Sequence, residues 1–213
     1  MKTKLTTLFS LALVLCILPF ALQAQRTSGS GEVIKQTREV GSFTGIKVGG
    51  AFNVEITPSE KISLTVESDD NLMDHIITEV EGNVLEIKSK GNIKNPSELN
   101  IYISLPNLTS LDVSGAANVY TVSGTTLSAS KFEMEASGAS NVNVNLNAGD
   151  VSVEISGAAD VVLTGVATSL EAEVSGAGSL KAERLDTPKS IVNASGAGDI
   201  KIAGTGVVSA TTS

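Results

Sequence analysis

One short phrase occurs five times between Val113 and Lys201, and it constrains this chain more than any other feature. It reads Ser-Gly-Ala, then a small residue, then Asn, Asp or Ser, and an aliphatic residue follows each time. The serines are 23, 19, 19 and 20 residues apart, at Ser114, Ser137, Ser156, Ser175 and Ser195. A regular period of about 20 residues is typical of a solenoid, in which one structural unit stacks on the next.

The residues before each phrase alternate between apolar and polar. Counting back from the serine, the first and third positions are apolar in every repeat, and the second is acidic in four of the five. A period of two is that of a strand with one buried and one exposed face. We therefore expect a strand before each phrase and another after it, with an outward column formed by Asp112, Glu135, Glu154, Glu173 and Asn193.

The phrase itself predicts a sharp corner in each repeat. Glycine permits backbone angles that other residues avoid, and the alanine is expected to fit inside the bend. The serine and the Asn, Asp or Ser four residues later can bond to the repeats above and below. Turns between antiparallel hairpins are the alternative. The predicted corner residues are Ser114, Gly115, Ala116, Ser137, Gly138, Ala139, Ser156, Gly157, Ala158, Ser175, Gly176, Ala177, Ser195, Gly196 and Ala197.

The N-terminus has the pattern of a secretory signal peptide. Lys2 and Lys4 precede an apolar run from Leu8 to Phe20, and Ala24 offers a cleavage point. An N-terminal anchor helix is the alternative. We expect a signal peptide over residues 1–24, a flexible Gly/Ser-rich tether over 25–39 and a single domain over 40–213, without a membrane span after cleavage.

The single cysteine and the charge of the chain limit its chemistry and its partners. Cys16 lies inside the apolar run, so the processed chain is expected to have neither disulfides nor thiol chemistry. The chain has 15 basic residues, two of them in the leader, against 23 acidic ones. This excess of negative charge argues against nucleic acid and anionic membranes as partners. Aromatic residues make up only 3%, and no aromatic platform for sugars is evident.

The N-terminal half repeats the same pattern less regularly. Residues 48–54 (Val-Gly-Gly-Ala-Phe-Asn-Val) look like a sixth copy of the phrase, 65 residues upstream of Ser114. That distance leaves room for about three irregular coils, and a separate N-terminal sandwich is the alternative. Residues 70–76 predict a helical turn, with a plain loop as the alternative.

The acidic column is the most suggestive candidate site. If the repeats stack, its carboxylates lie about 5 Å apart, at a cost of roughly 1 kcal/mol per pair in water. Asp112, Glu135, Glu154 and Glu173 then form a solvated face, a calcium-binding stripe or a glycosidase-like carboxylate pair. His75, the sole histidine, is read as a loop or cap residue rather than a base. No cofactor is expected.

Several segments together resemble a known family. Residues 43–56 (Phe-Thr-Gly-Ile-Lys-Val-Gly-Gly-Ala-Phe-Asn-Val-Glu-Ile), 66–72 (Val-Glu-Ser-Asp-Asp-Asn-Leu) and 84–87 (Val-Leu-Glu-Ile), followed by the repeated phrases, resemble the DUF2807 family, also called the putative auto-transporter adhesin head GIN domain. The resemblance spans roughly Val40 to Gly204. It implies an all-β fold, a right-handed parallel β-helix with coils of about 20 residues. It brings no catalytic residues.

These observations predict an exported, non-catalytic interaction module of the periplasm or cell surface. Its partner is expected to be an envelope protein or a glycan, and its solenoid ends could form a homo-oligomer. The rival hypothesis is a carbohydrate-active β-helix enzyme, either a polysaccharide lyase or a glycosidase, that uses the acidic column.

Overall fold

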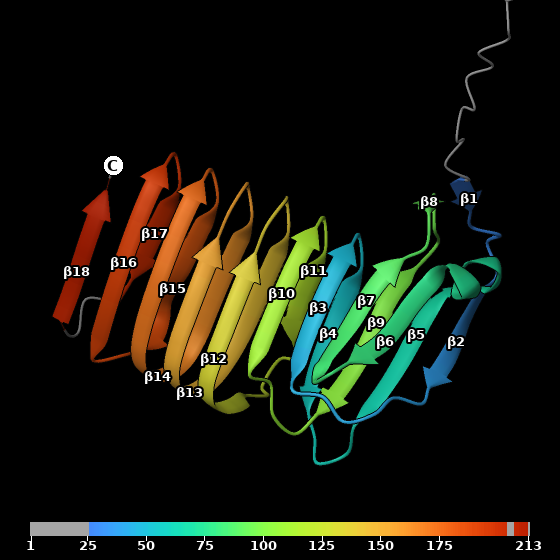
Figure 1. The fold of residues 1–213 in the computed structure, drawn as a ribbon, viewed down its shortest axis with the longest axis horizontal. Helices are drawn as coiled ribbons and strands as arrows, with labels where there is room; N and C mark the ends of the chain where they lie inside the picture. Colours follow the sequence, from blue (N-terminus) through green and yellow to red (C-terminus); the bar gives the residue numbers. More distant parts are fainter. Residues whose placement is uncertain (1–25, 204–206, 213) are drawn as a thin grey trace, which may run out of the picture.

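The computed structural model describes residues 26–203 and 207–212. The predicted signal peptide and Cys16 lie outside these residues. The described chain is all-β apart from one 3₁₀ helix, which confirms the predicted class (Figure 1). The strands are β1 (Arg26–Ser28), β2 (Val33–Arg38), β3 (Gly45–Gly50), β4 (Asn53–Pro58), β5 (Ser63–Asp69), β6 (Ile76–Glu81), β7 (Val84–Ser89), β8 (Asn92–Lys94), β9 (Leu99–Leu105), β10 (Ser110–Gly115), β11 (Asn118–Thr121), β12 (Leu127–Ala136), β13 (Asn141–Ile155), β14 (Asp160–Gly176), β15 (Ser179–Asp186), β16 (Lys189–Gly196), β17 (Asp199–Ile202) and β18 (Val207–Thr212).

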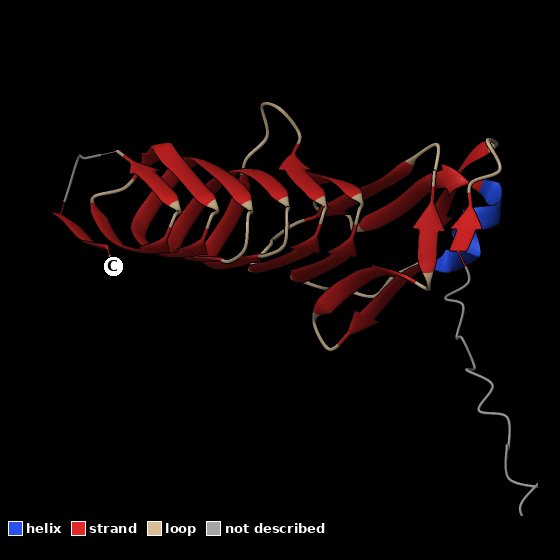
Figure 2. Ribbon diagram, turned by 90° about the horizontal axis from the view of Figure 1, so that it is seen from above, coloured by secondary structure: helices blue, strands red, loops and turns tan. Residues whose placement is uncertain are grey.

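Sixteen of these strands form one large mixed sheet, and β1 pairs separately with β8. The sheet folds over on itself, so that two rows of strands face each other (Figure 2). The first row, built from the segments before the phrases, follows the order β6, β7, β3, β10, β12, β13, β14, β16, β18. The second row, built from the segments after them, follows the order β2, β5, β9, β4, β11, β13, β14, β15, β17. The long strands β13 and β14 contribute to both rows.

The repeats pair in parallel and in register, as the phrases predict. In the second row Asn118 lies opposite Asn141, and Asn141 lies opposite Asp160. In the first row Glu135 lies opposite Glu154, and Glu154 opposite Glu173. Equivalent positions of successive repeats are therefore direct neighbours, which creates the predicted columns and excludes antiparallel hairpins between these repeats.

The core lies between the two rows and consists of the predicted inward positions. Val113, Ile155 and Val174, each just before a phrase, are fully buried, whereas the equivalent Ala194 near the end of the row is half-buried. One cluster of buried side chains continues from Phe43 to Val192. The alternative of a separate N-terminal sandwich is therefore wrong.

The order of the repeats at the N-terminal end differs from the prediction. The sixth copy of the phrase lies directly beside the first of the five, with Gly50 opposite Gly115, so no coils lie between them. The intervening residues instead place β7 and β9 on the other side of β3 and β4. Beyond these strands, β5 pairs antiparallel with β9, and β6 pairs antiparallel with β7. The strands β7 and β9 thus follow β3 and β4 in sequence but lie on the side of them that faces away from β10 and β11, an order that the period alone does not reveal.

The segment predicted to be a flexible tether, residues 25–39, contains two strands. β1 pairs with β8, and β2 pairs antiparallel with β5. The guanidinium of Arg38 donates to the carbonyl oxygens of Ile76 (2.6 Å) and Met73 (2.8 Å). These long-range bonds attach a Gly/Ser-rich segment that has little local preference for a strand.

A buried carboxylate holds the same end of the molecule together. Asp69 is 0% exposed and accepts hydrogen bonds from the backbone N–H groups of Gly31 and Ser97, both at 2.7 Å. Burial by itself would raise the pKa of Asp69, but the hydrogen bonds from Ser97 and Gly31 lower it below its usual value. The predicted helical turn is confirmed as η1 (Asp70–His75), directly after this residue.

Candidate functional surface

The glycine of each phrase makes the corner, because its backbone has a positive φ. The φ angles are 87° at Gly115, 74° at Gly138 and 74° at Gly157. A Cβ atom added to Gly138 would lie 2.4 Å from the carbonyl oxygen of Gly115 in the neighbouring corner. The next residue, Ala139, donates its N–H to that same oxygen at 2.8 Å. The corners therefore pack backbone to backbone.

The prediction that the alanine of the phrase fits inside the bend is wrong. Ala116, Ala139, Ala158, Ala177 and Ala197 are all exposed. The residue after the alanine points inward instead, as at Ala117 and Ala159, which are 0% exposed. After the glycine with its positive φ, the alanine lies outward and the next residue lies inward. The small residue that the core requires is therefore the fourth of the phrase.

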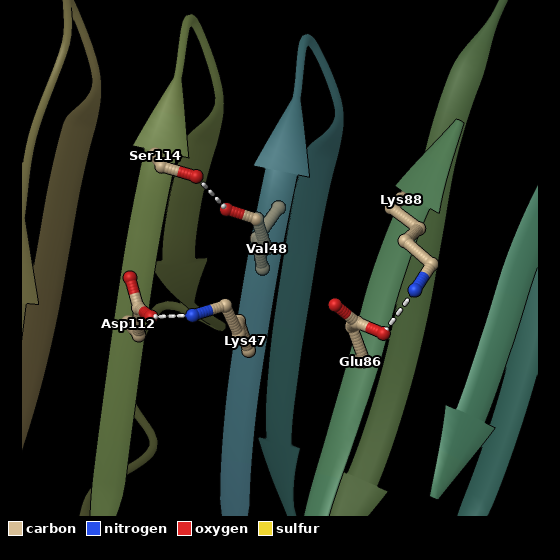
Figure 3. A network of polar contacts seen from close by, with 6 residues as sticks. All are labelled: Lys47, Val48, Glu86, Lys88, Asp112 and Ser114. Carbon is tan, nitrogen blue, oxygen red and sulfur yellow. Dashed lines mark hydrogen bonds and ion pairs between the residues drawn. The ribbon is translucent and has the colours of Figure 1, made fainter. Parts of the chain in front are cut away.

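Two of the five serines of the phrase bond through their hydroxyl groups to the neighbouring repeat. Ser114 Oγ donates to the carbonyl oxygen of Val48 at 3.1 Å (Figure 3). Ser175 Oγ donates to the carbonyl oxygen of Ile155 at 3.4 Å. These hydroxyls satisfy main-chain carbonyl groups at the corner. The repeated phrase is thus a structural element of the fold.

The predicted acidic column is present on the outer surface of the first row. Glu135, Glu154 and Glu173 are exposed and lie side by side in register. Lys47 lies in the same column, in register with Asp112 on one side and Glu86 on the other, and its Nζ pairs with Asp112 at 2.6 Å (Figure 3). The hydrogen bond and charge of Asp112 raise the pKa of Lys47 above its usual value.

No metal-binding group is formed by the described residues. Across 26–203 and 207–212, no cluster of three or more His, Cys, Asp or Glu side chains is arranged to hold an ion. His75, at the end of η1, contacts Thr27 Oγ1 at 3.4 Å and the carbonyl oxygen of Lys90 at 3.2 Å. These contacts join β1 to the loop before β8, so His75 has a structural position.

The outer surface of the second row carries a ladder of amides. Asn53 Nδ2 donates to Asn100 Oδ1 at 3.1 Å, and Asn118 Nδ2 donates to Asn53 Oδ1 at 2.9 Å. The next amide, Asn141, donates to Asn118 at 3.1 Å. Further along, Ser179 Oγ donates to Asp160. The prediction that the Asn, Asp or Ser at the end of the phrase bonds between repeats is confirmed for the first four of the five phrases.

A second column runs parallel to this ladder, two residues later along each strand, and it contains both tyrosines of the chain. Tyr102 belongs to a closed network: its hydroxyl donates to Glu67 Oε2 at 2.5 Å, and Lys35 Nζ lies 4.9 Å from its ring centre. The hydrogen bond to Glu67 raises the pKa of Tyr102 to about 12. Tyr120 is 39% exposed, and its hydroxyl reaches only Glu55, at 3.3 Å. Of the two rings, Tyr120 is the one available to a ligand.

The two columns enclose a shallow groove of about 420 Å³. Its polar lining includes Asn118, Tyr120, Asn141, Asn143, Asp160 and Lys181. The sequence analysis missed this surface because it examined the apolar and acidic columns only. The spacing was nevertheless a signal: the sixth position after each serine also forms an outward column, which consists of Tyr120, Asn143, Val162, Lys181 and Lys201.

No helix among the described residues has the length and apolar character to cross a membrane. No curated protein matches the chain at a significant level. A crystal structure described as a putative adhesin from Bacteroides fragilis is 25% identical, covers 87% of each chain and has a TM-score of 0.82.

Two further crystal structures share the fold. One, described as a putative adhesin from Parabacteroides distasonis, is 21% identical with a TM-score of 0.72 and covers 84% of each chain. Another from the same species, described as a putative lipid binding protein, is 19% identical with a TM-score of 0.70, covering 88% of this chain and 96% of that one. The family model described as "Putative auto-transporter adhesin, head GIN domain" (DUF2807) matches residues 42–213. The chain belongs to the DUF2807 family.

Proposed function

We propose that this protein is an exported, non-catalytic interaction module of the adhesin type, located in the periplasm or at the cell surface. In this proposal the stacked repeats form a right-handed parallel β-helix whose function is to display side chains on its outer surfaces. The observation that carries it is the register: the outer positions of successive repeats form continuous columns on both rows. Such columns offer a partner many equivalent contacts, none of which needs a pocket.

The rival hypothesis, a carbohydrate-active enzyme using the acidic column, has weaker support. Acid–base catalysis by two carboxylates depends on environments that separate their pKa values. Glu135, Glu154 and Glu173 occupy equivalent exposed positions on adjacent strands. A column of like residues in like surroundings does not distinguish an acid from a base.

Two measurements on the purified protein test the proposal. Beads coated with the protein are expected to retain bacterial cells or outer-membrane vesicles, whereas beads coated with the heat-unfolded protein are not. Incubation with polysaccharides is expected to produce neither new reducing ends nor unsaturated products. Equal retention by both bead types would contradict the interaction role. Turnover that is abolished by Glu154→Gln would establish the enzyme instead.

A further inference from the structure

We propose that the groove around Tyr120 binds an uncharged polysaccharide, whose sugar units lie across the strands of the second row. This inference rests on the proposed function and names its ligand. The groove has about 420 Å³ and crosses four successive repeats, which contribute Tyr120, Asn143, Val162 and Lys181. It is open to solvent rather than an enclosed cavity, so a chain of linked units can continue beyond it.

The amides supply hydrogen bonds suited to hydroxyl groups. An asparagine side chain has two donor and two acceptor positions, and a sugar hydroxyl is likewise both a donor and an acceptor. Asn118 and Asn141 use only part of this capacity in the ladder between them. Asn143 is exposed and makes no side-chain hydrogen bond with any described residue. The ladder bonds orient the amides of Asn118 and Asn141 before the ligand arrives, which reduces the entropy lost on binding.

Tyr120 supplies the apolar contact that positions a sugar ring. Its ring is 39% exposed, and the partly exposed Val162 also lines the groove. An aromatic side chain offers a large rigid contact at low entropic cost. Tyr102 does not offer this contact because Lys35 lies over its ring.

The charges at the groove favour an uncharged ligand. Asp160 and Lys181 contribute one charge of each sign, and Glu55 lies beside the hydroxyl of Tyr120. The whole chain has a net charge of −8, which repels polyanions.

The backbone at the groove argues against an extended peptide. β11 is paired on one side with β4 and on the other with β13. Its main-chain groups are therefore not free to bond an added strand, which is how extended peptides join a sheet edge.

Affinity electrophoresis of the full protein tests the inference. The probes are dextran, laminarin and mannan as uncharged polysaccharides, and polygalacturonate and hyaluronate as acidic ones. We expect at least one uncharged polysaccharide to retard the protein and neither acidic one to do so. Tyr120→Ala and Asn143→Ala are each expected to weaken that binding at least tenfold, equivalent to about 1.4 kcal/mol.

Matched variants separate the groove from the rest of the surface. Asn193→Ala makes the same change at an exposed asparagine of the first row, and Glu154→Gln alters the acidic column. Both are expected to bind like the wild type, and circular dichroism of each variant checks the fold. Retardation by no uncharged polysaccharide overturns the inference, as does binding that Tyr120→Ala and Asn143→Ala leave intact. In either case, retention of cells by the coated beads would still support the interaction role.

Discussion

Replacing Gly138 with alanine is expected to destabilise the protein much more than the same replacement at Gly124. Both glycines have a positive φ, 74° and 80° respectively. They differ in their surroundings: a Cβ at Gly138 would meet the Gly115 carbonyl oxygen at 2.4 Å, whereas a Cβ at Gly124 has nothing within 4 Å. The pair therefore separates the strain of the backbone angle from the packing of one corner on the next.

The magnitude follows from the contributions at each site. A left-handed backbone costs an L-residue about 1–2 kcal/mol. The lower entropy of alanine in the unfolded chain offsets about 0.4–1 kcal/mol of this. Gly124→Ala should therefore cost about 1 kcal/mol. At Gly138 the new methyl group also displaces the corner and weakens the 2.8 Å bond from Ala139 to Gly115, a bond that contributes about 0.5–1.5 kcal/mol. Including the misfit of the surrounding corner, we expect about 2–4 kcal/mol for Gly138→Ala.

Urea unfolding followed by far-ultraviolet circular dichroism measures this difference. In thermal unfolding a protein of this size loses roughly 2–4 °C for each kcal/mol, so the two variants should be clearly separated. Equal destabilisation by the two substitutions would refute the reasoning. It would mean that packing between neighbouring corners contributes nothing to stability, and that glycine is required for its backbone angle alone.

Three further predictions concern the core, a tyrosine and calcium. Ala159→Leu should cost about 1–3 kcal/mol by overpacking, whereas Ala158→Leu should be near neutral, because only Ala159 is buried; urea unfolding would contradict this if the two costs were reversed. The hydrogen bond to Glu67 raises the pKa of Tyr102 from 10.0 to about 12, so the folded state holds this proton more tightly than the unfolded state. The resulting stability is present below pH 10 and is lost as the pH rises towards 12, and Tyr102→Phe should remove this part of the pH dependence of unfolding; an unchanged dependence would contradict the assignment. Millimolar Ca²⁺ should leave the melting temperature unchanged, whereas a site filled at a hundredfold excess over its Kd would add about 2.7 kcal/mol of stability; such a rise would restore the calcium stripe as a hypothesis.

The strands and the columns could be predicted from the sequence because both depend on short-range periodicity. Alternation identified which face of each strand is buried, as at Ile155 and Glu154. The period of the phrase gave the register, because a repeat of nearly constant length places equivalent residues side by side. The glycine corner was predicted for a similar reason, since Gly157 needs a backbone angle that few other residues adopt.

The same reasoning failed where one residue decided the direction of the chain. It assigned the inward position to Ala158, but the positive φ of Gly157 turns Ala159 inward instead. Composition was also misleading for residues 25–39. Their strands exist because Arg38 and the buried Asp69 bond to distant segments, and composition carries no information on such contacts.

The sequence by itself determined that this protein is a repeating β structure with an acidic column along one outer surface. Only the tertiary structure decided the order of the coils at the N-terminal end, because that order depends on pairings across 65 residues, such as Gly50 with Gly115. It also decided which of the two tyrosine rings is exposed. Tyr102 and Tyr120 lie on either side of Glu55 in one column of the sheet. Lys35 and Glu67 enclose the ring of Tyr102, whereas Tyr120 is left exposed.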